Sequence, residues 1–207
     1  MGKRQNNLAK ILMEGGLSVF HPVVPDRSLF FQSAFDSELS RVYKTLGGIL
    51  PEYPLNFGSF DIVLQNCFIE LDEENHFHRY RRITLDSKFY NDHSYFSIKD
   101  FKEFCDSYEH KASTYGNYWT TSGSEKQYGV SSIKGDFSGN GPARWKQRAF
   151  YDMLKDVYGV LVNKPVFRVS IYSVIGNSKV DKILKKSDSD DLLFQYIQEE
   201  FLSKSVT

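Results

Sequence analysis

The sequence has little cysteine, no excess of either charge and no long apolar run. Its 207 residues include two cysteines, too few for a disulfide framework or a structural zinc site. Basic and acidic residues number 26 each, so any nucleic-acid surface must be a local patch. No apolar run approaches the length of a membrane span, and the first residues do not resemble a signal peptide. We therefore expect a cytoplasmic protein with no membrane partner.

Aromatic residues, in contrast, are plentiful. They make up 15% of the chain, which is enough both for a core and for stacking on nucleic-acid bases. The length suits one domain with a buried core, or one domain with a large insertion. We expect a single domain spanning residues 1–207.

Residues 58–72 alternate in the manner of strands that bury one face. Gln65-Asn66 provides a turn between two such strands, because asparagine tolerates the positive φ that tight hairpin turns require. A two-residue turn here places Asp61 directly opposite Glu70. The side chains expected on the apolar face are Phe60, Ile62, Leu64, Cys67, Ile69 and Leu71.

Three carboxylates gather at one end of this hairpin: Asp61, Glu70 and Asp72. Opposed side chains of an antiparallel pair have Cβ atoms about 5 Å apart, and like charges at that distance repel. A divalent cation removes the repulsion, because hard cations take clustered oxygen ligands. The alternative is a solvated outer face, on which acidic residues carry no function. The pattern therefore predicts a metal site, and a solvated outer face without function remains the alternative.

The order Asp61, hairpin, Glu70-x-Asp72 resembles the motif of the PD-(D/E)XK nuclease superfamily, with Asp72 where lysine is usual. Residues 69–76 are similar to a variant found in domains like the very-short-patch-repair endonuclease, which carry Asp, a hairpin, Glu-x-Asp and a downstream His. The resemblance implies that Mg²⁺ or Mn²⁺ is held by Asp61, Glu70 and Asp72. It also implies that His76 holds the attacking water or neutralises developing charge.

Residues 143–159 form the strongest helical pattern in the chain. Gln147 and Tyr151 are four residues apart and share a face, which resembles the Gln-x-x-x-Tyr pair in the exonuclease branch of the same superfamily. Lys146 or Arg148 is the candidate for the cation missing at position 72. An ordinary amphipathic helix with a basic flank remains the alternative.

Residues 76–82 combine cations with aromatic rings. Guanidinium groups suit phosphate geometry and rings stack on bases, so this run predicts nucleic-acid contacts, with a solvated face forming surface ion pairs as the alternative. The expected nucleic-acid-binding residues are Arg79, Arg81, Arg82, Arg148 and Tyr151.

The remaining segments fit the same resemblance. A helix expected over about 28–46 carries Glu38, a candidate for the helix acid of such nucleases or an ordinary exposed carboxylate. A strand is expected within 165–175, a long insertion over about 83–143 and a C-terminal helix over about 190–202. The order helix, hairpin, strand, helix, strand implies an α/β fold with a restriction-endonuclease-like core, in which helices flank a mixed sheet. The insertion or the last helix is the expected surface for a homodimer or another protein.

Two functions follow from these observations. The first is a magnesium-dependent endo- or exonuclease that hydrolyses DNA or RNA in repair or defence. The second is an inactive member of the same fold that serves as a nucleic-acid-binding or assembly module, because Asp72 replaces the usual lysine.

Overall fold

The computed structural model describes residues 2–22, 24–114, 118–186 and 191–202. Its main sheet has three strands in the order β1-β2-β3, with β1 antiparallel and β3 parallel to the central β2. The strands are β1 (Ile62–Val63), β2 (Phe68–Asp72) and β3 (Val166–Ser170). A small mixed sheet among many helices makes this an α/β fold.

The β1–β2 hairpin has the register that the sequence predicts. Ile62 faces Ile69 and Val63 faces Phe68, and the Leu64 N–H donates to the Cys67 carbonyl at 3.0 Å across the Gln65-Asn66 turn. The six apolar side chains expected on one face of the hairpin are all buried. The residues of the opposite face in β1 and β2 are buried as well, so the expectation that only one face is covered is wrong. This register brings Asp61, one residue before β1, level with Glu70.

Helix α7 (Ala143–Leu161) connects the insertion to β3 and packs on the sheet. We expected it to end at Gly159, but it continues for two more residues. The glycine serves close packing instead, since a Cβ at Gly159 would lie 2.7 Å from the Lys164 carbonyl oxygen and 2.5 Å from the Val166 side chain. The tight crossing from α7 into β3 therefore depends on the missing side chain.

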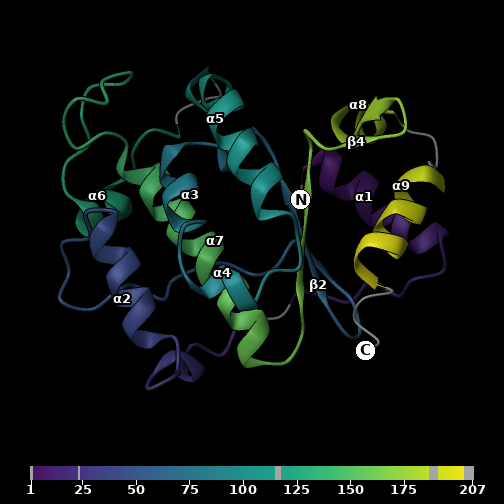
Figure 1. The fold of residues 1–207 in the computed structure, drawn as a ribbon, viewed down its shortest axis with the longest axis horizontal. Coiled ribbons are helices and arrows are strands. Elements are labelled where there is room, and N and C mark those ends of the chain that lie inside the picture. The colour runs from purple at the N-terminus through teal and green to yellow at the C-terminus, as the bar shows by residue number, and fades with distance from the viewer. Residues whose placement is uncertain (1, 23, 115–117, 187–190, 203–207) are drawn as a thin grey trace.

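Helices lie on both sides of the sheet (Figure 1). On one side α7 packs against α2 (Asp36–Thr45), α3 (Arg79–Thr84) and α6 (Ser122–Tyr128). On the other side α1 (Lys3–Glu14) packs against α8 (Val180–Lys185) and α9 (Asp191–Ile197). The remaining elements are α4 (Phe89–Asp92), α5 (Ile98–Thr114), β4 (Val174–Ile175), β5 (Ser178–Lys179), the 3-10 turns η1 (Arg27–Phe30) and η2 (Glu74–His76), and a π-helical turn, η3 (Gln198–Leu202).

Several boundaries differ from those we predicted. The helix expected over 28–46 is divided into η1 and α2, and Gln32 between them has a φ of 59°, which interrupts a right-handed helix. The 83–143 insertion contains α4, α5 and α6. The C-terminal helix begins at Asp191, and residue 190 lies outside the described residues. Within the described ranges, no helix combines the length and apolarity that crossing a membrane requires.

Candidate active site

Asp61 and Glu70 are joined through the backbone of the hairpin. The Leu71 N–H donates to Asp61 Oδ2 at 2.9 Å, and the Asp61 N–H donates to Glu70 Oε1 at 3.0 Å. Each carboxylate thus binds the strand that carries the other. The prediction that these two residues meet on adjacent antiparallel segments is confirmed.

Glu70 is almost fully buried, at 1% exposure, and its partner is a lysine of α7. Lys155 Nζ lies 2.7 Å from Glu70 Oε2. Burial raises the pKa of Glu70 to about 7, against the opposing effect of Lys155 and with a smaller contribution from the Asp61 charge. One lysine therefore does not supply enough positive charge to keep this carboxyl at its ordinary pKa.

A small cavity of about 190 Å³ opens over this pair. Its lining residues from α7 recur at three- and four-residue spacing and therefore share one face of the helix. The described residues that line the cavity are Gly58, Asp61, Glu70, His76, Arg144, Arg148, Tyr151, Asp152 and Lys155.

Two of the lining residues, Arg144 and Arg148, have no carboxylate partner among the described residues. Arg144 contacts the side-chain oxygen of Gln147, and Arg148 Nη1 lies 3.0 Å from His76 Nε2. Burial and the neighbouring Arg148 charge lower the pKa of Arg144. Two guanidinium groups that lack a counter-ion and lie beside a cavity provide a binding site for an anion.

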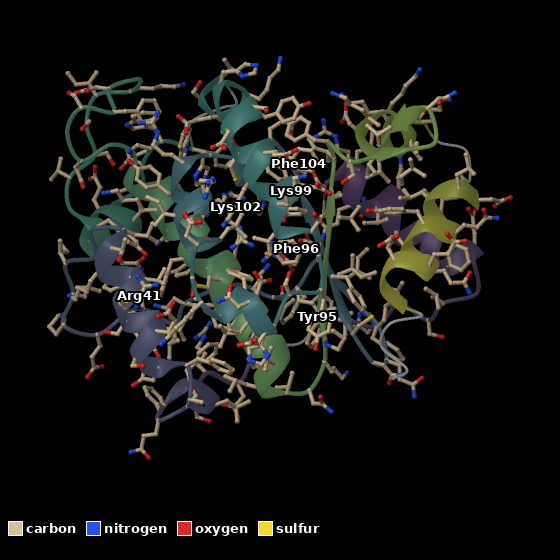
Figure 2. All side chains as sticks on the ribbon, in the orientation of Figure 1. Arg41, Tyr95, Phe96, Lys99, Lys102 and Phe104 are labelled. Carbon is tan, nitrogen blue, oxygen red and sulfur yellow. The ribbon has the colours of Figure 1, made fainter. Side chains whose placement is uncertain are left out.

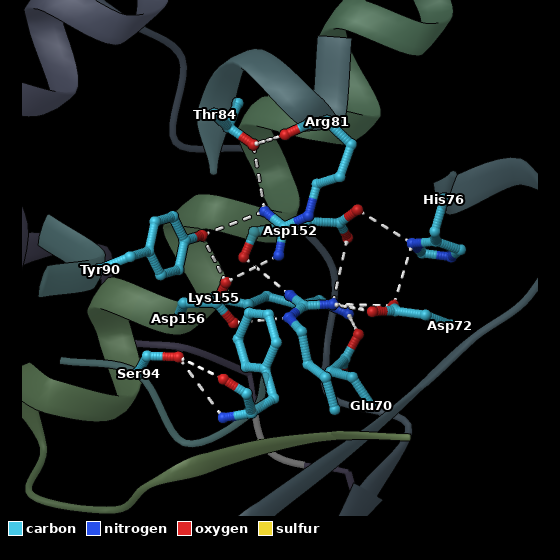
Figure 3. A network of polar contacts seen from close by, with 12 residues as sticks. Glu70, Asp72, His76, Arg81, Thr84, Tyr90, Ser94, Asp152, Lys155 and Asp156 are labelled. Carbon is cyan, nitrogen blue, oxygen red and sulfur yellow. Dashed lines mark hydrogen bonds and ion pairs between the residues drawn. The ribbon is translucent and has the colours of Figure 1, made fainter. Parts of the chain in front are cut away.

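Asp72 does not lie with Asp61 and Glu70, contrary to our expectation of one three-carboxylate metal site. Arg168 Nη1 donates to both of its oxygens, at 2.8 and 3.0 Å (Figure 3). His76 Nδ1 lies 3.2 Å from Asp72 Oδ1 and 2.9 Å from Asp152 Oδ2. Asp72, His76 and Asp152 offer ligand atoms within 4.8 Å of one another, but Arg168 already neutralises Asp72.

The predicted nucleic-acid contacts of α3 are wrong for Arg81. It is 1% exposed, and its Nη2 lies 3.1 Å from Asp156 in the buried network around Arg168 (Figure 3). Arg79 pairs with Glu109 at 2.6 Å, and Arg82 pairs with Asp86 at 2.8 Å. Each of these guanidinium groups has a carboxylate partner within the protein.

The cation beside Glu70 is Lys155 and not Lys146, which we had proposed. Lys146 Nζ donates to Asn140 Oδ1 at 2.6 Å and lies over the Tyr80 ring. Lys155 continues the four-residue series of Gln147 and Tyr151, so the signal that identifies it was present in the sequence. Tyr151, expected to contact nucleic acid, lines the cavity.

Gln147 and Glu38 point to other neighbours. Gln147 Nε2 donates to Gln127 Oε1 at 2.8 Å, towards α6. Glu38 is 5% exposed and is bound by Arg41 and Ser87. The helix acid that the resemblance suggested is therefore buried in an ion pair of its own.

Helix α1 contributes a residue that the sequence pattern did not reveal. Gln5 Nε2 donates to the Asp61 carbonyl and to Asp61 Oδ1, both at 3.1 Å. With the Leu71 N–H on Oδ2, both oxygens of the Asp61 carboxylate are held in place. The pairing joins residues 56 positions apart, and no local motif predicts such a contact.

Comparison with known proteins gives one match. The model of a family described as "Family of unknown function (DUF7255)" matches residues 41–186. That segment contains the hairpin, α7 and β3, but not α1. No curated protein and no solved structure matches the chain.

Proposed function

We propose that this chain, which belongs to the family of unknown function DUF7255, is a metal-dependent nuclease that hydrolyses phosphodiester bonds of DNA or RNA. One observation carries the proposal. Two carboxylates of a β-hairpin, Asp61 and Glu70, meet a lysine of the following helix, Lys155, in one small cavity. The same cavity contains two arginines, neither of which forms an ion pair with a carboxylate in the described part of the chain.

The topology supports a restriction-endonuclease-like core only in part, because the described residues contain no strand between the hairpin and α7, where we expected one. A helix, α2, precedes the hairpin, and β2 continues through α7 to the parallel strand β3. In such a unit the helix lies across the sheet and turns one face to the central strand. Here that face brings Lys155 to Glu70. In the PD-(D/E)XK motif the lysine usually comes from the strand itself, two residues after the glutamate, where this chain has Asp72.

The donor atoms fit a divalent cation. Each oxygen of Asp61 and Glu70 accepts a hydrogen bond, and a carboxylate oxygen has a second lone pair to offer. Burial raises the pKa of Glu70 to about 7, and a cation beside the carboxylate would offset that effect. The three acidic side chains of the cavity balance Arg144, Arg148 and Lys155, so a divalent ion would make it cationic and attractive to phosphate.

The roles of the side chains follow from their contacts. A Mg²⁺ or Mn²⁺ ion held by Asp61 and Glu70 would polarise the scissile phosphate and lower the pKa of a water ligand. Arg144 and Arg148 bind the non-bridging phosphate oxygens in the paired geometry that guanidinium groups allow. Lys155 holds Glu70 in place and offsets charge that develops on the phosphate.

His76 is a positioning residue for this phosphate site. Its Nδ1 is bound by Asp152 and Asp72, and its Nε2 lies against Arg148 Nη1. With the proton on Nδ1, Nε2 accepts from Arg148 and fixes the guanidinium at the cavity. The ring thereby connects the buried acids to the predicted phosphate contact.

Binding without cleavage is the second candidate function. It is favoured by the charges of the cavity, which already balance without an added ion. In that case the arginines and Tyr151 would hold a nucleic acid, and no bond would be broken.

Cleavage assays separate these two functions. Purified protein, supplied with Mg²⁺ or Mn²⁺, is expected to degrade at least one of single-stranded DNA, duplex DNA and RNA. Excess chelator should stop the reaction and fresh metal should restore it. If none of these substrates is cut with either metal while binding is retained, the protein is a binding module.

Arg144→Ala and Arg148→Ala are each expected to weaken nucleic-acid binding by about tenfold, close to 1.4 kcal/mol, since each removes one phosphate contact. Binding is measured by fluorescence anisotropy of a labelled oligonucleotide in Ca²⁺. Arg82→Ala is the matched control, because Arg82 is already paired with Asp86. Equal losses of nucleic-acid affinity in all three variants would show that only the overall charge matters and would rule out a specific phosphate site.

The affinity for Mn²⁺ is expected to fall as the pH drops below about 7, because protons compete for Glu70, whose pKa is raised to about 7 by burial. One competing proton changes the affinity by about tenfold per pH unit. Lys155→Met should move the midpoint to higher pH, since Lys155 lowers the pKa of Glu70. Titration of Mn²⁺ by electron paramagnetic resonance measures both, and an affinity that is flat across this range would exclude Glu70 as a ligand.

A further inference from the structure

A second and larger cavity, of about 680 Å³, lies on the other edge of the sheet, beside β3. Aromatic rings from four parts of the chain line it. Figure 2 labels three of them, Tyr95, Phe96 and Phe104, which lie along the side of β3. Its ring residues are Tyr95, Phe96, Phe101, Phe104, Phe167 and Tyr196. The volume lies in the range of about 300–1,000 Å³ that is typical of small-molecule sites.

The backbone of β3 supplies polar groups to this cavity. In a parallel ladder, alternate residues of a strand bond to its neighbour. The Phe68 N–H donates to the Pro165 carbonyl and the Ile171 N–H donates to the Asp72 carbonyl, so the odd-numbered residues of β3 face β2. Arg168, which lines the cavity, therefore turns its N–H and its carbonyl to the other edge, and no strand of the described part of the chain pairs there.

The charges of the cavity exclude a phosphate from its interior. Arg168 is the only cation among the described residues that line the cavity, and its guanidinium group is already hydrogen-bonded to other partners. Its guanidinium donates to Asp156, Asp72 and the Asp152 carbonyl on the α7 side. Two exposed acids, Asp100 and Glu200, also line the cavity. Burial raises the pKa of Tyr196, and the charges of these two acids raise it further.

We propose that this cavity binds one neutral, planar heteroaromatic ring of the nucleobase type. Rings of the cavity stack on its faces, as aromatic side chains do on unpaired bases. The adjacent N–H and carbonyl of Arg168 match the neighbouring acceptor and donor on the edge of a base. The site is separate from the Asp61–Glu70 cavity and does not depend on the proposed nuclease activity.

The test is direct binding of adenosine, guanosine, cytidine and uridine to the full chain, measured by isothermal titration calorimetry. At least one nucleoside should bind, and its 5′-monophosphate should bind several-fold more weakly because of Asp100 and Glu200. Val174→Trp fills the opening from a position that is 61% exposed, and it should weaken binding at least tenfold. Ile133→Trp, at a position that is 84% exposed and does not line the cavity, should have no effect.

Each outcome supports or overturns the proposal. The double variant Asp100→Asn with Glu200→Gln should abolish the preference for nucleoside over monophosphate. If no nucleoside binds, or if Val174→Trp and wild type bind equally well, the cavity is not a base site. A monophosphate that binds wild type as tightly as its nucleoside would also overturn it, because the ligand class rests on the two exposed acids.

Discussion

Asp61→Ala is expected to reduce metal-dependent cleavage by roughly 10³-fold or more, since the ion contributes several kcal/mol to stabilising the transition state. Glu70→Ala should have a comparable effect. The fold should survive in Asp61→Ala, because the substitution removes only the hydrogen bonds from the Leu71 N–H and from Gln5 to the side chain. Each of them contributes about 1 kcal/mol to stability. Single-turnover rates and Mn²⁺ affinity, measured together, test this prediction.

Asp106→Ala is the matched control for Asp61→Ala, because its side chain is 66% exposed and lies on α5. It should cut and bind metal like wild type. Circular dichroism establishes that both variants are folded. If Asp61→Ala cleaves at the wild-type rate, Asp61 does not hold the ion, and the reading of the hairpin as a metal site fails.

Arg168→Met is expected to lower the free energy of unfolding by about 3–5 kcal/mol, the usual cost of removing one partner from a buried ion pair. The guanidinium bonds Asp72, Asp156 and the Asp152 carbonyl, and its side chain is fully buried. Without it, Asp72 loses its only arginine partner among the described residues, and Asp156 keeps only the ion pair with Arg81. Because whole domains are stable by only about 5–15 kcal/mol, urea denaturation should reveal a large loss.

Arg82→Met provides the comparison, since Arg82 makes an exposed ion pair with Asp86 that contributes at most about 1 kcal/mol. The pH dependence adds a second test. Burial raises the pKa of Asp152, but the hydrogen bond from His76 Nδ1 and the charge of Arg168 outweigh it and hold this pKa well below its usual value. The ionised form of Asp152 therefore stabilises the fold above about pH 4 and loses this role in acid. The deficit of Arg168→Met should therefore shrink as the pH falls, and a deficit no larger than that of Arg82→Met would contradict the prediction.

The hairpin could be predicted because its determinants are local. The alternation identified the two strands and the Gln65-Asn66 turn set their register, so Asp61 and Glu70 were placed correctly opposite each other. The burial of both faces could not be predicted from the alternation, because it depends on helices that pack on each side of the sheet. The ion pair of Asp72 could not be predicted in this way. Its partner, Arg168, lies 96 positions away and reaches it only through the pairing of β2 with β3.

The cations show the same division between local and distant information. A run of arginines at 79–82 predicts a phosphate surface, yet Arg81 is buried because Asp156, 75 positions away, neutralises it. On α7 the sequence limits Lys146 and Lys155 to particular faces of the helix. Which of those faces meets Glu70 is decided by how α7 packs on the sheet, and a single sequence does not state that.

Helix α1 has a practical consequence for anyone who truncates this protein. The matched family segment begins at residue 41, whereas Leu8 and Leu12 are fully buried and Gln5 binds Asp61. A fragment cut to residues 41–186 would therefore expose apolar surface on the remaining body and release the Asp61 carboxylate from one of its donors. The unit that folds is larger than the unit that sequence comparison recognises, and recombinant boundaries are better drawn from the packing of α1 than from the family match.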